Sequence, residues 1–182
     1  MGILKSITDL LLRLNTALLL VCKYLIIIIV AVIAGILIAS VFFRYALNDA
    51  LSWAEESSKY LMVWLTFLGA PIALRHFGHI NIDLLISILP ARLEQFMYFM
   101  VSLIVGLTMA IVLWKGWGFA EVGARQVAST FNLSMVYLYI AVPIGAALTF
   151  LVAIEQALQA LAGVFNPAKG LALSHKEIDA AT

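Results

Sequence analysis

The chain has 182 residues, of which 64% are hydrophobic and only 12% are charged. A soluble protein of this length cannot cover so much apolar surface with so few charges, so the composition is that of an integral membrane protein. The net charge of +1 excludes nucleic acid as an evident partner. Cys22 is the only cysteine, which excludes an internal disulfide.

The first 18 residues carry apolar side chains at helical spacing, with most polar side chains elsewhere on the helix. This pattern is typical of an amphipathic helix that lies in the membrane surface. We therefore expect an interfacial helix over residues 1–18, which serves either as a simple anchor or as a collar against a partner subunit. The apolar positions are Ile3, Leu4, Ile7, Leu10, Leu11, Leu14 and Leu18.

Four apolar stretches contain charge-free runs at residues 24–43, 60–74, 95–114 and 126–154. A bilayer core of roughly 30 Å requires about 20 helical residues. The second run is shorter, so it must extend back through Lys59, whose amine can reach the headgroups. The sequence thus predicts an all-α integral membrane protein, one domain over residues 1–182, with spans near 20–43, 52–74, 94–115 and 134–157. The alternative has three spans, with residues 52–74 re-entrant or lying in the interface.

Lysine and arginine residues indicate the orientation, because they are enriched in the cytoplasmic loops of membrane proteins. With the N-terminus inside, seven of them lie in inside segments and four in outside loops. We therefore expect both termini in the cytoplasm, with a polar cytoplasmic tail over residues 166–182. The inside set is Lys5, Arg13, Lys23, Arg75, Arg92, Lys169 and Lys176, and the outside set is Arg44, Lys59, Lys115 and Arg125.

The second span begins with an acidic segment next to Trp53. Ser52 is a candidate N-cap with Glu55 three residues further on, which is the capping-box pattern. Glu55 and Lys59 also form a favourable pair four residues apart. Local helix structure can therefore explain Glu55, Glu56 and Lys59. The functional alternatives are a docking surface for an outside partner, or a proton or cation site.

The same span ends with Arg75 and two histidines, followed by Asp83. In a helix, His76, His79 and Asp83 share a face that could hold a metal. Gly78 interrupts this face, however, and no fourth ligand is evident. The favoured interpretation is a polar helix end at the cytoplasmic headgroups, with Arg75 near anionic lipid and His79 and Asp83 contacting lipid or another subunit.

Small residues recur four positions apart in every span, which lets helix backbones approach closely in lipid. Pro71 and Pro143 each remove a helix hydrogen bond and predict a kink in the second and fourth spans. We expect close helix packing at Gly35, Gly69, Gly106 and Gly145.

The charged residues all lie at the ends of the expected spans, whereas ionisable residues inside the membrane mark ion and substrate pathways. A chain with nothing to coordinate Na⁺, a proton or an anionic solute at mid-membrane is a poor transporter by itself. No nucleophile and base are placed together, so the sequence does not support an enzyme. These observations favour an accessory or scaffold subunit.

The most specific sequence lies between residues 44 and 83. It contains Arg44-Tyr45, WAEE at 53–56, WLTFLGA at 64–70, Arg75, and HINID at 79–83. Together with YLYIAVPIG at 137–145, this set resembles the small membrane subunit, of the Q or DctQ type, of TRAP (tripartite ATP-independent periplasmic) transporters. The resemblance covers nearly the whole chain.

The resemblance implies a bacterial inner-membrane protein that pairs with a large M-type subunit, which would hold the substrate and Na⁺ sites. A periplasmic binding protein would deliver an organic acid, such as a C4-dicarboxylate or sialic acid. The small subunit would act as a scaffold that helps dock the binding protein, and it would carry no cofactor itself. In the family pattern Trp53, Glu55 and Glu56 match the external start of the second helix. Arg75, His79 and Asp83 match its cytoplasmic end.

Two other hypotheses belong to different classes of protein. One is a membrane anchor for a redox or respiratory complex, which a copurified haem or quinone would favour. The other is a self-assembling channel, which conductance by the chain alone would favour. The motifs between residues 44 and 83 favour the transporter subunit.

Overall fold

Long helices make up nearly all of the part of the chain that the computed structural model describes, residues 2–77, 91–130 and 133–165. Four helical stretches are long and apolar enough to cross a membrane, which confirms the all-α membrane fold and the four expected spans. The second is one continuous helix of 26 residues, which favours four spans over the re-entrant alternative. The helices are α1 (Gly2–Ala46), α2 (Ser52–Phe77), α4 (Ala91–Gly123), α5 (Val136–Tyr139) and α6 (Ala141–Phe165).

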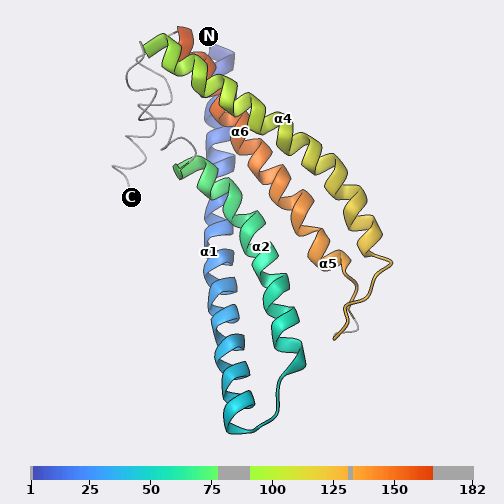
Figure 1. Ribbon diagram of the computed structural model, residues 1–182. Coiled ribbons are helices and arrows are strands. Elements are labelled where there is room, and N and C mark those ends of the chain that lie inside the picture. The colour runs from blue at the N-terminus through green and yellow to red at the C-terminus, as the bar shows by residue number, and fades with distance from the viewer. Residues whose placement is uncertain (1, 78–90, 131–132, 166–182) are drawn as a thin grey trace.

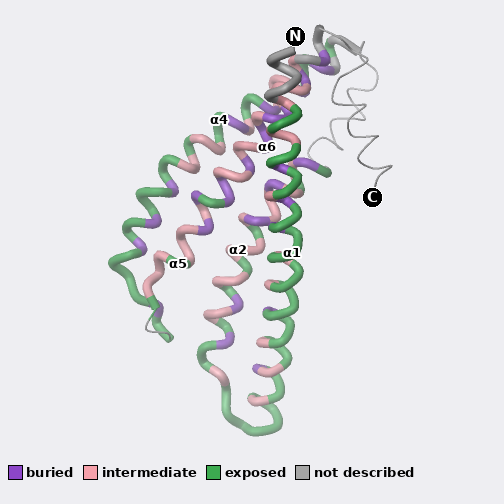
Figure 2. Tube along the Cα trace, turned by 180° about the vertical axis from the view of Figure 1, so that it is seen from behind, coloured by how far each residue is buried: buried purple, intermediate pink, exposed green. Residues whose placement is uncertain are grey.

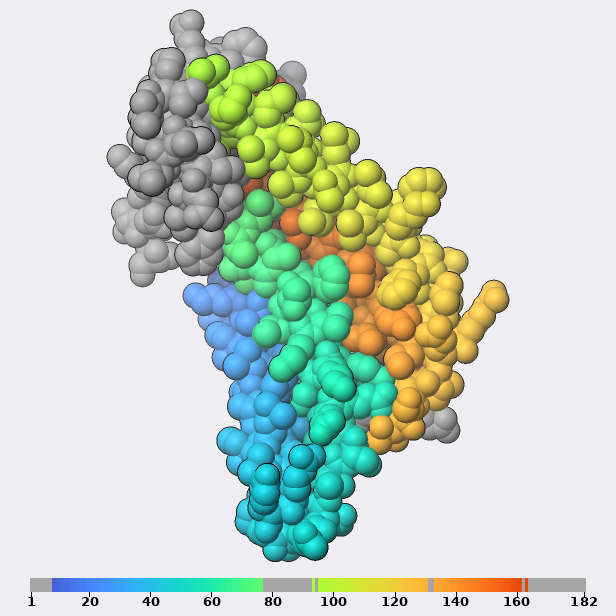
Figure 3. All heavy atoms as spheres, in the orientation of Figure 1, coloured from blue at the N-terminus to red at the C-terminus, as the bar shows by residue number. Residues whose placement is uncertain are grey.

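The helices form two antiparallel hairpins that lie side by side (Figure 1). One hairpin is α1 with α2, and the other is α4 with α5 and α6. The α1–α2 loop (47–51) and the α4–α5 connection (124–135) lie toward the same end of the bundle, which we call the loop end. The start of α1, the end of α2, the start of α4 and the end of α6 lie toward the opposite end, which we call the terminal end. On the face shown in Figure 3, α2 separates α1 from α6.

The α6 helix lies at the centre of the bundle, because it packs against α4 on one side and against α2 and α1 on the other. In its most apolar stretch 39% of the residues are buried, compared with 11% in α1. Figure 2 shows the contrast, with exposed positions following one another along α1. These exposed side chains are mostly aliphatic, such as Ile38 at 71% exposure, so the face suits lipid chains or an apolar protein surface.

The first helix is much longer than a membrane span. Its 45 residues extend about 70 Å at 1.5 Å per residue, whereas a bilayer core measures roughly 30 Å. The helix expected at residues 1–18 is therefore continuous with the first span over the described residues. Its orientation in the membrane surface stays a prediction.

The prolines act differently from each other. The α2 helix continues through buried Pro71 to Phe77. Pro143 lies in the first turn of α6 and has no N–H to donate to the carbonyl of Tyr139, which is the last residue of α5. The expected kink in the fourth span coincides with the junction of α5 and α6 at Ile140, whose backbone angles stay helical (φ −67°, ψ −17°).

The α1–α2 loop turns at Asn48, the one described non-glycine residue with positive φ (55°). Asparagine tolerates this left-handed conformation better than most residues. The turn lets the N–H of Asp49 donate to the carbonyl of Phe43, at 3.2 Å, after α1 has ended.

The four glycines predicted for helix packing have different surroundings. A Cβ at Gly145 would lie 2.6 Å from both the Cβ and the carbonyl oxygen of Phe67, so α2 and α6 cross closely there. A Cβ at Gly106 would lie 3.7 Å from Ala153, and one at Gly69 would lie 4.0 Å from Ile26. No described atom lies within 4 Å of a Cβ built at Gly35, which is exposed. Gly106 and Gly145 therefore serve packing within the chain, whereas Gly35 is left for lipid or a partner.

Candidate docking surface at the loop end

The loop end carries a shallow, open hollow of about 370 Å³. It forms where the first turns of α2 face the connection between α4 and α5. Glu55, Glu56 and Lys59, which the sequence analysis singled out, all line it, and Trp53 is 39% exposed beside them. The full lining is Ser52, Glu55, Glu56, Lys59, Tyr60, Ser129, Thr130 and Met135.

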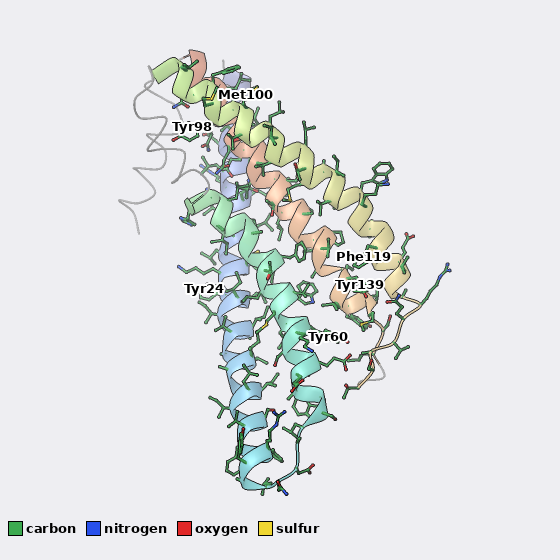
Figure 4. The ribbon with its side chains drawn as sticks, viewed as in Figure 1. Tyr24, Tyr60, Tyr98, Met100, Phe119 and Tyr139 are labelled. Carbon is green, nitrogen blue, oxygen red and sulfur yellow. The ribbon has the colours of Figure 1, made fainter. Side chains whose placement is uncertain are left out.

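Glu56 joins α2 to the α4–α5 connection. Its carboxylate accepts hydrogen bonds from the backbone N–H of Ser129 at 3.2 Å and of Thr130 at 2.8 Å. The Tyr60 hydroxyl also donates to it. Figure 4 shows Tyr60 on the side of α2 that faces the connection, where its oxygen lies 3.3 Å from the sulfur of Met135. Hydrogen bonds to an ionised acceptor are stronger than neutral ones, so Glu56 holds the connection in a defined position.

The connection also has backbone pairing of its own. The N–H of Ala128 donates to the carbonyl of Leu133, and the N–H of Met135 donates to the carbonyl of Gln126, both at 2.9 Å. An isolated antiparallel bridge lies between these two bonds. This local pairing and the bonds to Glu56 together give the described residues of the connection a fixed shape.

Two contacts hold α5, which follows the connection, against α2 and α4. The indole N–H of Trp64 on α2 donates to the carbonyl of Tyr137 at 3.0 Å. The rings of Phe119 on α4 and Tyr139 on α5 have their centroids 4.2 Å apart and lie next to each other in Figure 4. Trp64, Tyr137 and Tyr139 belong to the motifs that carry the resemblance, but their contacts could not be read from the sequence because the partners are far apart along the chain.

Glu55 pairs with a residue that its helical spacing did not indicate. Its carboxylate lies 3.2 Å from the guanidinium of Arg44, across the α1–α2 loop, and the two side chains are 65% and 50% exposed. Lys59, the partner expected four residues away, is exposed and belongs to neither ion pair in the described part of the chain. The ammonium group of Lys59 is therefore available to a partner, whereas both carboxylates already have partners within the chain.

Of the residues expected at the cytoplasmic headgroups, the structure describes Arg75, and it is buried. Arg75 is only 8% exposed and donates to Thr16 Oγ1 at 3.0 Å. Its guanidinium therefore lies inside the bundle instead of among lipid headgroups. Its carboxylate partner there, Glu155, is 80 residues away along the chain and could not be read from local spacing. His79 and Asp83 lie outside the described residues.

This arrangement defines a multi-pass helical membrane protein whose specific polar groups lie at the two ends of the bundle. Residues 33–163 match the family described as "Tripartite ATP-independent periplasmic transporters, DctQ component". The chain belongs to this family, which confirms the resemblance in its motifs. It is a transporter component and not an enzyme.

Several relatives resemble parts of the chain. It is 35% identical over 83 residues to the C4-dicarboxylate TRAP transporter small permease protein DctQ of Vibrio cholerae, covering 43% of this chain and 35% of that protein. It is 29% identical over 104 residues to the sialic acid TRAP transporter small permease protein SiaQ of Vibrio cholerae, covering 56% and 59%. A match of 37% over 73 residues to the sialic acid TRAP transporter permease protein SiaT of Haemophilus influenzae covers 40% of this chain and 12% of that longer protein.

The chain thus spans less than two thirds of the length of each of these relatives. All three are TRAP transporter proteins, so they give no support to the alternative of a redox-complex anchor.

Proposed function

We propose that this chain is the scaffold subunit of a binding-protein-dependent transporter that imports a small organic acid. Its membership of the DctQ family over residues 33–163 carries the proposal. In this arrangement a large M-type membrane subunit holds the substrate site and the Na⁺ sites that drive import. The charge-free runs at 24–43, 60–74 and 95–114 support a chain that does not itself conduct ions.

The proposed substrate class is an organic acid of the C4-dicarboxylate or sialic acid type. It rests on relatives named for transport of these compounds. The partner subunits, which contact the substrate in this scheme, decide between them.

The proposed location is the bacterial inner membrane, with both termini in the cytoplasm and the loop end in the periplasm. The excess of lysine and arginine in the inside segments supports this orientation. Trp114 and Trp117, which are 74% and 59% exposed near the loop end of α4, support an interface there because indole rings settle at headgroup level.

The proposed docking surface for the periplasmic binding protein is the loop-end hollow with the α4–α5 connection. Support comes from the fixed shape of this surface, since a preorganised surface loses less conformational entropy on binding. The exposed ammonium group of Lys59 adds a charge that the described residues do not neutralise. In this proposal a carboxylate on the binding protein pairs with the ammonium group of Lys59.

The test of this function is reconstitution with the neighbouring genes. The chain is coexpressed with an adjacent large hydrophobic subunit, placed in proteoliposomes, and assayed for Na⁺-dependent uptake of C4-dicarboxylates and sialic acid. We expect uptake only when this chain, the large subunit and the secreted binding protein are all present. Full uptake without this chain, or failure of the two membrane proteins to copurify, contradicts the scaffold role.

A further inference from the structure

A cluster of buried polar side chains lies toward the terminal end, away from the docking surface. Asn15 on α1 donates from Nδ2 to Glu155 Oε2 at 2.6 Å and to the carbonyl of Leu151 at 3.1 Å. Arg75 on α2 donates to Thr16 Oγ1 at 3.0 Å, and its Nη2 lies 3.5 Å from Glu155 Oε1. One carboxylate on α6 thus contacts both helices of the other hairpin.

The pair formed by Arg75 and Glu155 is almost removed from solvent, with side chains 9% and 4% exposed. Buried charges require partners, and removing one member leaves an uncompensated charge. The Glu155 carboxylate has a further hydrogen-bond donor, because Gln159 Nε2 also donates to it at 3.2 Å. A second bond between the hairpins runs from Gln156 Nε2 to the carbonyl of Leu74, at 3.0 Å.

The polar links at the loop end are more accessible to water. The bonds from the backbone N–H groups of Ser129 and Thr130 to Glu56 lie at exposed positions. Water competes for exposed hydrogen-bonding groups, so such bonds contribute less to holding two elements together than buried ones do. The firmest polar connection between the hairpins is therefore the one at the terminal end.

We propose that Asn15, Arg75 and Glu155 are positioning residues that set the placement of the α1–α2 hairpin against α6. We call these three residues the terminal clasp. The clasp acts through geometry, because hydrogen bonds require particular distances and angles, whereas apolar contacts are non-directional. The proposal concerns the packing of the chain itself and not transport. It can therefore be correct or wrong whether or not the proposed function is correct.

The experiment measures the distance between the hairpins in folded protein. Spin labels are attached at Ile38→Cys on α1 and Ile111→Cys on α4, which are 71% and 59% exposed, in a Cys22→Ala background. Double electron–electron resonance then gives the distribution of distances in detergent. We expect Arg75→Met and Glu155→Gln each to broaden this distribution about twofold, because a partner of a buried charge is lost.

The matched control is Glu55→Gln, which breaks the exposed pair with Arg44 inside one hairpin. It should leave the distribution unchanged. The double variant Arg75→Met with Glu155→Leu leaves no unpaired charge, so it should fold as well as the parent protein yet keep the broadened distribution. This result would distinguish an effect on the distance between the hairpins from an effect on the stability of the fold.

An unchanged, narrow distribution in the double variant overturns the proposal. If the single variants do not fold, the double variant and Arg75→Lys, which keeps the charge but not the guanidinium geometry, provide the test. A narrow distribution in both would mean that apolar packing alone places the hairpins.

Discussion

At the scale of single residues, Glu55 and Glu56 are adjacent in the sequence and have different roles. Glu56 accepts two backbone N–H groups and one hydroxyl from within the chain, whereas Glu55 forms an exposed pair with Arg44. A carboxylate satisfied in this way supports a surface and is less available to a partner. Of the three polar residues predicted for docking, Lys59 is thus the one whose charge faces outward unpaired by the described residues.

The role of Glu56 predicts a local effect of Glu56→Ala. The amides of Ser129 and Thr130 lose their acceptor, so their hydrogen exchange should accelerate several-fold, whereas exchange in the middle of α6 should not change. Exchange mass spectrometry on peptides covering 124–135 checks this. Glu55→Gln is the control, and equal acceleration in both variants contradicts the assignment.

The close crossing of α2 and α6 predicts a strong effect of Gly145→Ala. The new methyl group would lie 2.6 Å from Phe67, and overpacking of this kind costs roughly 1–3 kcal/mol. The melting temperature in detergent should fall accordingly. Gly35→Ala is the matched control, because the described residues leave open space there. Equal melting temperatures for the two variants would show that the crossing can relax.

At the scale of helices, the sequence predicts the number of spanning helices correctly but does not predict where each helix begins and ends. The amphipathic pattern of residues 3–18 predicts a surface helix, yet α1 continues from Gly2 to Ala46. Backbone hydrogen bonding favours this continuity, since residues 3–34 contain neither proline nor glycine. Pro143 has the opposite effect and separates α5 from α6.

The continuity of α1 predicts how membrane depth changes along it. In a straight helix that enters the bilayer, spin labels placed singly from Thr8 to Tyr24 move deeper by up to 1.5 Å per residue. Power saturation with oxygen and a nickel chelate measures that depth. Labels that stay at one depth from Thr8 to Leu18, and move deeper only afterwards, would show a separate surface helix and contradict the continuous entry.

At the scale of the whole molecule, two hairpins are joined at three levels. Glu56 connects them at the loop end. Trp64 donates to Tyr137 and Phe67 packs on Gly145 near the middle of α2, and Arg75 meets Glu155 toward the terminal end. The hydrophobic effect does not drive helices together within lipid, so close packing and interhelical hydrogen bonds provide the association. The resulting bundle leaves an apolar face of α1 uncovered by the described residues.

The whole-molecule arrangement predicts where the binding protein docks. Lys59→Glu reverses the unpaired charge in the loop-end hollow, so the binding-protein concentration that gives half-maximal uptake should rise about tenfold, as for loss of a close charge pair. The yield of the complex with the large subunit should not change. Lys115→Glu, outside the hollow, is the control. An unchanged half-maximal concentration for Lys59→Glu contradicts docking at this surface.

The sequence by itself determined the membrane class, the number of spanning helices and the family. Each of these depends on local properties: the length of an apolar run decides whether it can span a bilayer, and short motifs at residues 44–83 carry the resemblance. The ends of α2 could also be placed from composition, since acidic residues open it and basic residues close it.

Only the tertiary structure decided what the polar residues do. Asn15, Arg75 and Glu155 come from three helices, and the pair of Glu56 with Thr130 bridges 74 positions along the chain. A polar side chain removed from water must find a partner, but the identity of that partner depends on which helices pack together. That choice follows from close contacts such as Phe67 on Gly145, which no local pattern contains.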